Sequence, residues 1–211
     1  MLQIKQTLEA ALNRQYPCPK GIPGRLIGEL MVRQHKIETH WSVSLADVQS
    51  TDCVLELGFG AGKAIELLAA RARQGQVYGL DISPTMVKRA SERNSRAIRA
   101  GRVILRQGDI AQLPFADCQF DTIVSIHTFY FWSDPQAVFT EILRVLKPGG
   151  KLICILATGK MGESDYYQSI VDTQTLPLMR SLGFTDVSTC QGPLSRQFKI
   201  LAMLGSRPVA S

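Results

Sequence analysis

The sequence predicts an α/β fold: a doubly wound, mostly parallel sheet that ends in a C-terminal antiparallel hairpin. Short apolar runs alternate with helix-like segments from residue 53 to residue 182. This alternation is typical of parallel strands that carry helices on both faces. The last two apolar runs, near 185–190 and 197–204, are joined only by a short link that contains Gly192-Pro193. Since such a link is too short for a crossover helix, these two strands are expected to pair antiparallel.

The parallel strands are expected at five apolar runs, which are residues 53–57, 76–80, 103–106, 120–126 and 151–157. The helices between and after them are expected at residues 62–73, 83–98, 134–147 and 173–182. Ser83-Pro84 and Asp134-Pro135 each combine an N-cap residue with a proline in the first helical turn. Gly75 and Gly183 are the expected helix stops.

The first 51 residues precede the first strand and have a different character. A Pro/Gly-rich piece, YPCPKGIPG at 16–24, separates a short N-terminal helix from the segment 25–47. That segment carries apolar residues near helical spacing, namely Leu26, Ile27, Leu30, Met31 and Ile37. We predict a helix there, with a break near Thr39. In one structural domain overall, residues 1–51 form an N-terminal helical lid segment and residues 52–211 the main unit.

The lid interpretation follows from where the apolar residues of segment 25–47 can be buried. In an open α/β sheet, the surface near the carboxyl edge of the first strand is the ligand crevice. We expect Leu26, Ile27, Leu30 and Met31 to be buried against it, with His40, Trp41 and Arg33 facing the bound molecules. The alternative is a helix that packs on the outer face of the sheet.

Composition excludes several classes of protein. The chain of 211 residues suits one domain, with 45% hydrophobic and 20% charged residues. No apolar run approaches the roughly 18 residues of a membrane span, and the charged N-terminus lacks a signal core, so we expect a cytoplasmic protein. The five cysteines are scattered without a CxxC spacing, which argues against a disulfide framework and a structural zinc site.

The formal net charge of +6 leaves two interpretations open. Much of the excess lies between Arg71 and Arg106, on two predicted helices and the following strand. These residues could be solvated helix faces, or they could attract an acidic substrate or nucleic acid. No aromatic residues interleave with them, so the stacking platform of a single-strand-binding protein is absent. Nucleic acid is therefore an unlikely partner, and the oligomeric state is not predicted.

A glycine-rich turn is the first sign of a ligand site. The run ELGFGAG at 56–62 follows a strand and opens a helix. Its glycines allow a tight turn and a close approach of the backbone to a ligand, at the edge where open sheets bind ligands. The third glycine comes one residue earlier than in the GxGxxG loop of dinucleotide enzymes, whose helix N-terminus faces a pyrophosphate.

Asp81 adds a second element to this site. It ends the second strand, 19 residues after Gly62. At this spacing an acidic side chain can accept hydrogen bonds from both ribose hydroxyls of an adenosine. A helix-capping role is less suitable, because Ser83 already occupies the better capping position.

The ordered motifs resemble those of the class I methyltransferases that depend on S-adenosylmethionine (SAM). ELGFGAG resembles the first motif of that family and GLDIS at 79–83 the second. QGDI at 107–110, followed by LPF, resembles the segment that binds adenine. FDTIVS at 120–125 and EILRVLKPGG at 141–150 complete the series. The resemblance runs from about residue 52 to residue 157. It implies a Rossmann-like fold and is strongest to the small-molecule branch, which includes ubiquinone-type and natural-product enzymes.

Carried over residue by residue, the resemblance implies a cofactor site for SAM. Glu56 is expected near the methionine amino group, Asp81 on the ribose, and Asp109 with Ile110 at the adenine. Ser125 is expected to offer its backbone near the methionine end. The predicted cofactor-binding residues are Glu56, Gly58, Gly60, Gly62, Asp81, Ile82, Asp109, Ile110 and Ser125.

His127 is the candidate catalytic residue. It follows the fourth strand, at the carboxyl edge toward which the methyl group is expected to point. A histidine accepts a proton near neutral pH without a large pKa shift, so His127 is a candidate general base. The three histidines, His35, His40 and His127, could converge on a metal ion, but nothing in their spacing requires it, and we expect no metal.

These observations favour an enzyme that transfers a methyl group from SAM to a small-molecule acceptor by in-line displacement. The alternatives are a methyltransferase that acts on nucleic acid or protein, and a non-catalytic SAM-binding module. Base-amino methylators carry an Asn/Asp-Pro-Pro-aromatic motif after the fourth strand, whereas this chain has SIHT at 125–128. A nucleotide-dependent oxidoreductase is disfavoured by the loop spacing and the terminal hairpin.

Overall fold

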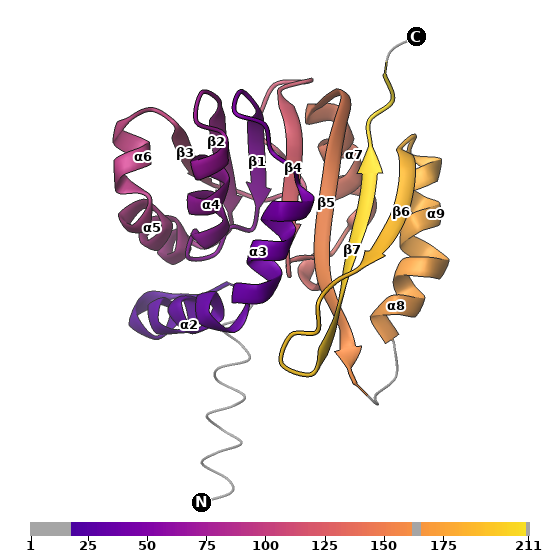
Figure 1. The fold of residues 1–211 in the computed structure, drawn as a ribbon, viewed down its shortest axis with the longest axis horizontal. Coiled ribbons are helices and arrows are strands. Elements are labelled where there is room, and N and C mark those ends of the chain that lie inside the picture. Colours follow the sequence, from indigo (N-terminus) through magenta and orange to yellow (C-terminus); the bar gives the residue numbers. More distant parts are fainter. Residues whose placement is uncertain (1–17, 162–165, 210–211) are drawn as a thin grey trace, which may run out of the picture.

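The computed structural model describes residues 18–161 and 166–209. They form one seven-stranded sheet in the order β3-β2-β1-β4-β5-β7-β6 (Figure 1). The short helix expected before residue 16 lies outside the described residues.

Five strands of the sheet are parallel. They are β1 (Cys53–Leu57), β2 (Gln76–Asp81), β3 (Val103–Gln107), β4 (Phe120–Ile126) and β5 (Leu146–Lys160). The chain runs outward from β1 to β3 and then returns to place β4 on the other side of β1. This reversal of strand order is the point at which open α/β sheets bind ligands.

The C-terminal hairpin closes the other edge. β7 (Phe198–Ser206) inserts between β5 and β6 (Thr185–Gln191) and pairs antiparallel with both. The fold class predicted from the sequence is therefore confirmed, including the terminal hairpin.

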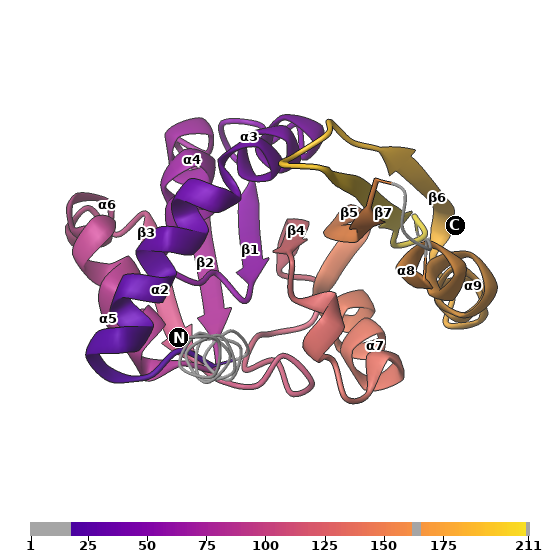
Figure 2. The same ribbon diagram turned by 90° about the horizontal axis from the view of Figure 1, so that it is seen from below.

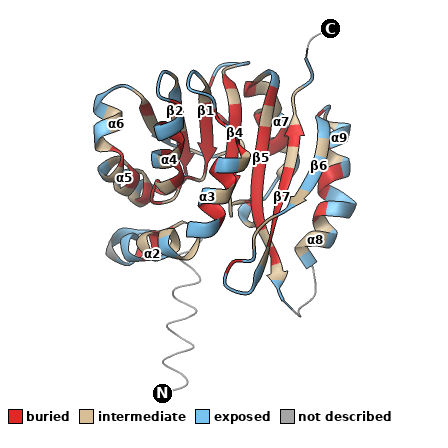
Figure 3. Cartoon of the chain, in the orientation of Figure 1, coloured by how far each residue is buried: buried red, intermediate tan, exposed pale blue. Residues whose placement is uncertain are grey.

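Helices cover both faces of the sheet, as Figure 2 shows from below. One face carries α3 (Lys36–Leu45), α4 (Lys63–Arg71), α5 (Pro84–Arg93) and α6 (Ser95–Arg99). The other carries α7 (Pro135–Val145), α8 (Tyr166–Ile170), a π-helical turn (Val171–Thr175) and α9 (Leu176–Ser181), with a short 3-10 turn (Phe129–Phe131) after β4. The central strands β1 and β4 are almost wholly buried between these layers, because each face is apolar against its helices, whereas the edge strand β6 is mostly exposed (Figure 3).

Two helices differ from the sequence-based expectation. The helix expected over 83–98 is interrupted at Asn94, whose buried amide donates to the carbonyl oxygens of Gly62 and Ala90. Helical structure begins before the helix expected over 173–182, with α8 at Tyr166–Ile170 and the π-helical turn that follows it. Gly183 ends α9 with a φ of 102°, as expected of a C-terminal glycine.

The segment before the first strand forms two helices, α2 (Gly21–Gln34) and α3, which meet at His35. The break predicted near Thr39 is therefore wrong by one turn. Figure 1 shows α2 crossing beneath the carboxyl ends of the parallel strands. Of the four apolar positions expected to be buried, Ile27 is buried, whereas Leu26 and Leu30 are 69% and 46% exposed.

Ion pairs and close packing hold α2 against α5. Glu29 binds both Arg89 and Arg93, at nitrogen–oxygen distances of 2.7 and 2.6 Å, and Arg25 binds Glu92 at 2.8 Å. These contacts neutralise part of the basic run noted in the sequence. They favour its interpretation as an ordinary helix surface. None of the helices in the described residues has the length and apolar character needed to cross a membrane.

Candidate functional site

A cavity of about 330 Å³ lies between α2 and the carboxyl edge of the sheet. Its wall combines the glycine-rich turn after β1, the ends of β2 and β4, the loop after β3, and the helices α2 and α3. Eight of the ten predicted site residues line it: Glu56, Gly58, Gly60, Asp81, Ile82, Asp109, Ile110 and His127. The topology thus brings together residues that come from four separate turns of the chain.

The glycine-rich turn needs its glycines for different reasons. Gly58, Gly60 and Gly62 all have positive φ angles, of 69°, 51° and 78°. A Cβ on Gly58 would lie 2.3 Å from Cγ2 of Thr128, whereas a Cβ on Gly60 would meet nothing within 4 Å. Since Gly60 lines the cavity, its backbone is directly accessible to a ligand.

Gly62 and Ser125 stand outside the cavity wall, contrary to the expectation. A Cβ on Gly62 would come within 2.6 Å of Ala90, so this glycine permits close packing of α4 on α5. Ser125 is fully buried, and its hydroxyl shares a short hydrogen bond with Thr128. Thr128 takes the place in the wall that was expected of Ser125. The sequence did not single out Thr128.

Asp81 connects the second strand to the glycine-rich turn. One carboxylate oxygen accepts from the backbone N–H of Gly60 at 2.8 Å, and the other accepts from Ser83 at 2.8 Å. The side chain is buried at the cavity wall. Burial raises the pKa of Asp81 to about 6, although the two backbone N–H groups oppose the shift.

Glu56 lies deeper in the same wall. It is 3% exposed, and its Oε2 has no hydrogen-bond partner among the described residues. Burial raises the pKa of Glu56 well above its ordinary value, the charge of Asp81 adds to this, and the backbone N–H of Ile65 offsets part of it. A buried carboxyl oxygen without a partner is costly, which suits an atom that receives a hydrogen bond from a ligand.

The loop after β3 forms the opposite end of the cavity. Asp109 is exposed and accepts from the backbone N–H of Ala111 at 2.9 Å. Ile82 is 53% exposed at the cavity wall, and Ile110 is half-buried beside it. Two aliphatic side chains and a carboxylate are what an adenine ring requires: apolar faces and an acceptor for its amino group.

His127 stands where β4 ends, in an unusual backbone conformation. Its φ is 57°, a value that few non-glycine residues adopt, and its N–H donates to the carbonyl oxygen of Ile155 at 2.8 Å. Its Nδ1 lies 3.3 Å from the hydroxyl of Tyr130. Burial lowers the pKa of His127 to about 3, a nearby His35 contributes in the same direction, and Glu38 opposes it. The sequence-based expectation of a histidine without a large pKa shift is therefore wrong.

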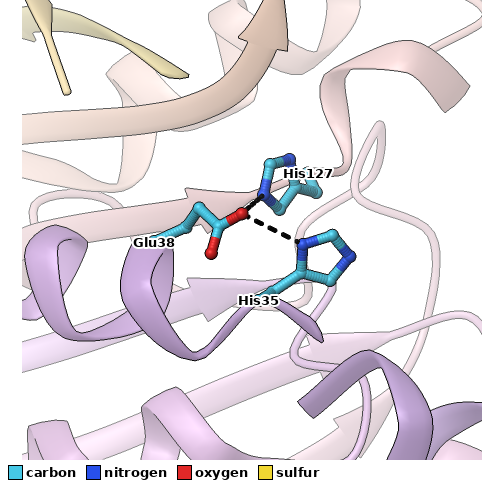
Figure 4. A group of neighbouring side chains, drawn as sticks. All are labelled: His35, Glu38 and His127. Carbon is cyan, nitrogen blue, oxygen red and sulfur yellow. Dashed lines mark ion pairs between the residues drawn. The ribbon is translucent and has the colours of Figure 1, made fainter. Parts of the chain in front are cut away.

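Residues from the N-terminal helices surround His127. The rings of His35 and His127 are 4.3 Å apart between centroids. Oε1 of Glu38 lies 3.5 Å from Nδ1 of His35 and 3.9 Å from Nε2 of His127 (Figure 4). Burial would raise the pKa of Glu38, but interactions with His35, the Glu38 backbone, Ser195 and His127 outweigh it and lower the pKa to about 2.

The N-terminal residues at the cavity are not those expected. His35 and Thr39 line it, together with Met31 and Val32, whereas His40, Trp41 and Arg33 do not. His40 is exposed, with Nδ1 2.8 Å from the carbonyl oxygen of Lys36. Trp41 instead packs against Gly192 of the terminal hairpin. Two aromatic residues that follow β4, Phe131 and Trp132, also line the cavity.

Comparison with known proteins agrees with this geometry. The family described as methyltransferase domain matches residues 55–154, from β1 to β5. The uncharacterized methyltransferase YdaC of Bacillus subtilis (strain 168) is 25% identical over 162 residues, which cover 77% of this chain and 87% of that protein. The demethylmenaquinone methyltransferase of Lactiplantibacillus plantarum is 36% identical over 120 residues, or 55% of this chain. The match spans 51% of that enzyme's length.

A solved structure shows the same fold. The SAM-dependent methyltransferase from Aquifex aeolicus superposes with a TM-score of 0.68 at 19% identity, covering 83% of this chain and 93% of that one. Residues 55–154 match a methyltransferase domain, and the methyltransferase relatives and the shared fold support a class I SAM-dependent methyltransferase. The protein is an enzyme, and SAM is its cofactor.

The cavity of the methyltransferase fits this cofactor. The turn at Gly60 leaves open space against which a ligand can lie, and the unpaired oxygen of Glu56 can accept from an ammonium group. Asp81 presents a buried carboxylate to the same space.

Proposed function

We propose that this methyltransferase acts on a small-molecule acceptor. The observation that carries the proposal is a cavity of about 330 Å³, which lies in the range of small-molecule sites and is roofed by α2. The similarity to an enzyme named for demethylmenaquinone supports it. Arg89 and Arg93 are paired with Glu29, so they offer little attraction to a nucleic acid.

We propose that SAM lies along the cavity from the β3 loop to His127. In this arrangement Asp109 and Ile110 hold the adenine with Ile82, and Asp81 accepts from the ribose hydroxyls. Glu56 accepts from the methionine amino group, next to the turn at Gly58 and Gly60. Each of these residues lines the cavity, which supports the order.

Position and exclusion of water are the main contributions of the chain. SAM supplies a methyl group that is already activated on a sulfonium sulfur, so the protein has little covalent chemistry to perform. Thr128, Phe131 and Trp132 form an apolar and polar wall beyond the end of β4. We propose that they orient the acceptor, and that His127 is the catalytic residue that faces its reacting atom.

The pH dependence of SAM affinity tests the role of Asp81. Because hydroxyl groups donate to the carboxylate, SAM is expected to bind the ionised form of Asp81, whose pKa is about 6. We therefore expect the affinity to fall as the pH drops below that value, by up to about tenfold per pH unit. Calorimetric titration over this range would reveal it. A SAM affinity that stays constant over this pH range would contradict the assignment. So would an Asp81→Asn variant whose SAM affinity depends on pH in the same way as that of the parent.

Limited proteolysis tests whether α2 is a lid. Its ion pairs with α5 are partly exposed, and such pairs contribute only about 0–1 kcal/mol each, so α2 can move without disrupting the sheet. We expect SAM to slow tryptic cleavage at Arg25, Arg33 and Lys36, since a bound ligand stabilises the closed arrangement. Cleavage at Arg196, in the hairpin loop, serves as the internal control. Equal rates with and without SAM at the three helix sites would assign α2 a purely structural role.

The class of acceptor is tested by methyl transfer itself. Labelled SAM is incubated with the enzyme and either a metabolite extract or total RNA. We expect label in low-molecular-weight products and none in RNA. Transfer to RNA alone would refute a small-molecule acceptor, and transfer to neither would favour a SAM-binding module.

A further inference from the structure

Three side chains that can bind a metal ion, those of His35, Glu38 and His127, converge beside the cavity, and each has a polar atom that lacks the partner a buried polar atom requires. One nitrogen of His35, one carboxylate oxygen of Glu38 and one nitrogen of His127 lie within 4.8 Å of one another. Nδ1 of His35, Oε2 of Glu38 and Nε2 of His127 have no hydrogen-bond partner among the described residues. The side chains of Glu38 and His127 are only 5% and 10% exposed. Buried polar groups are nearly always paired, so this cluster requires an explanation.

The hydrogen bonds of Tyr130 indicate which nitrogen of His127 is available. The hydroxyl of Tyr130 donates to the carbonyl oxygen of Ala157 at 3.1 Å. The backbone N–H of Ala157 donates to the same hydroxyl. We infer the His127 tautomer in which Nδ1, 3.3 Å away, donates to the remaining lone pair of this hydroxyl. Nε2 is then unprotonated, and its lone pair faces the carboxylate of Glu38. Two groups with lone pairs directed at each other are held together by a cation and repel without one.

The contacts within the cluster are too long for simple hydrogen bonds. Hydrogen bonds of this type span about 2.7–3.2 Å, whereas Oε1 of Glu38 lies 3.5 and 3.9 Å from the two histidine nitrogens. Two ligand atoms that each lie about 2.1 Å from a tetrahedral metal ion are about 3.4 Å from each other. The observed separations therefore fit a shared ion after small side-chain rotations.

The backbone holds the three residues in this arrangement. His35 lies at the junction of α2 and α3, and Glu38 follows three residues later, on the same side of the first turn of α3. His127 is held in its positive-φ conformation by the hydrogen bond to Ile155. Such strained residues concentrate at functional sites, where surrounding structure keeps a side chain in one place.

We propose that His35, Glu38 and His127 bind a divalent transition-metal ion of the zinc type. Two imidazoles and one carboxylate form a ligand set that suits such ions, whereas Mg²⁺ and Ca²⁺ require mostly oxygen ligands. Tyr130 supplies the outer contact that orients a ligating histidine. The proposal reverses the sequence-based expectation of no metal. The convergence involves Glu38 in place of His40.

The position of the site suggests the class of acceptor, a step that rests on the proposed function. His35 and His127 line the cavity, whereas Glu38 stands behind them. Remaining coordination positions would therefore face the cavity. We infer that the acceptor presents an oxygen ligand there, as a hydroxyl, phenol or enol group, whose acidity the ion would increase.

Metal binding is tested on the full chain, independently of methyl transfer. The protein is stripped with a chelator and titrated with Zn²⁺ against a chromophoric competitor. We expect one Zn²⁺ ion to bind per chain. Mg²⁺ is expected to bind too weakly to displace it. Loss of a residue that only hydrogen-bonds to a metal ligand lowers metal affinity by about 10–100-fold. Removal of a ligand itself, in His35→Ala or His127→Ala, should therefore lower the affinity for Zn²⁺ at least about a hundredfold. The matched control is His40→Ala, on the same segment but exposed and outside the cluster.

Parallel SAM titrations separate this proposal from the proposed function. Glu38→Gln preserves side-chain size, so it should still bind SAM while it loses affinity for Zn²⁺. This variant keeps the test decisive if His127→Ala does not fold. Asp81→Ala should show the reverse, retaining Zn²⁺ binding while its affinity for SAM falls at least about tenfold. Absence of stoichiometric Zn²⁺ binding in the parent overturns the metal site, as does binding that His35→Ala and Glu38→Gln leave unchanged. Neither result affects the SAM site.

Discussion

Replacement of Gly60 by valine is expected to abolish SAM binding while the sheet still folds. The φ of 51° at Gly60 is strained for a β-branched residue, and the added side chain would project into open space at the cavity wall. Because no protein atom lies within 4 Å of the new Cβ, the substitution costs the apo fold only backbone strain. The ligand would meet the whole side chain. We expect a loss of affinity of at least about a hundredfold, equivalent to about 2.8 kcal/mol, measured by calorimetry.

Gly101 offers a matched control for this substitution. Its φ is 70°, and a Cβ there would also meet nothing within 4 Å, but it lies on the surface between α6 and β3. Gly101→Val should therefore impose similar strain and leave SAM affinity intact. If the two variants lose SAM affinity equally, or if soluble Gly60→Val binds SAM like the parent, the glycine-rich turn is not the cofactor site.

Asp81→Ala is expected to have the second-largest effect. The substitution removes an acceptor for the ribose hydroxyls and frees the N–H groups of Gly60 and Ser83, which Asp81 now binds. Hydrogen bonds to charged groups contribute about 1.5–3 kcal/mol, so affinity for SAM should fall at least about tenfold. Asp81→Asn should retain part of the affinity, since an amide oxygen can still accept.

Asp121 separates cofactor binding from a general loss of stability. It too bridges two parts of the chain, accepting from the backbone N–H of Cys53 and from Lys147. It lies where β1 and β4 begin, at the opposite end of the strands from the cavity. Asp121→Ala is expected to lower the melting temperature and leave SAM affinity unchanged. Unchanged SAM affinity in folded Asp81→Ala would refute the ribose assignment.

The sheet and half of the site could be predicted because their signals are local. Each apolar run is a strand bounded by turn or cap residues. The positive φ of Gly60 favours glycine, and the glycines of this turn are visible in the sequence. Asp81 follows from its distance along the chain to the turn. Ser83 was expected as the N-cap of α5 and accepts from Met86, but its hydrogen bond to Pro19 could not be foreseen. That contact joins segments 64 residues apart.

The cluster of His35, Glu38 and His127 could not be predicted because it depends on how α2 and α3 pack. His35 and His127 are far apart in the chain, and no proline or glycine marks the junction at His35. The position of α2 comes from Glu29 and its two arginines on α5, and from the close contact of Gly28 with Met86. The only local signal was the spacing of His35 and Glu38, which places both on one side of a helical turn.

A crystal structure with S-adenosylhomocysteine, the product of methyl transfer, tests the central claim most directly. We predict that its ribose hydroxyls lie within hydrogen-bond distance of Asp81, with the adenine between Ile82 and Ile110 and the sulfur directed toward His127. Electron density for the product outside this cavity, or in the cavity with the adenine at the His127 end, would contradict the account.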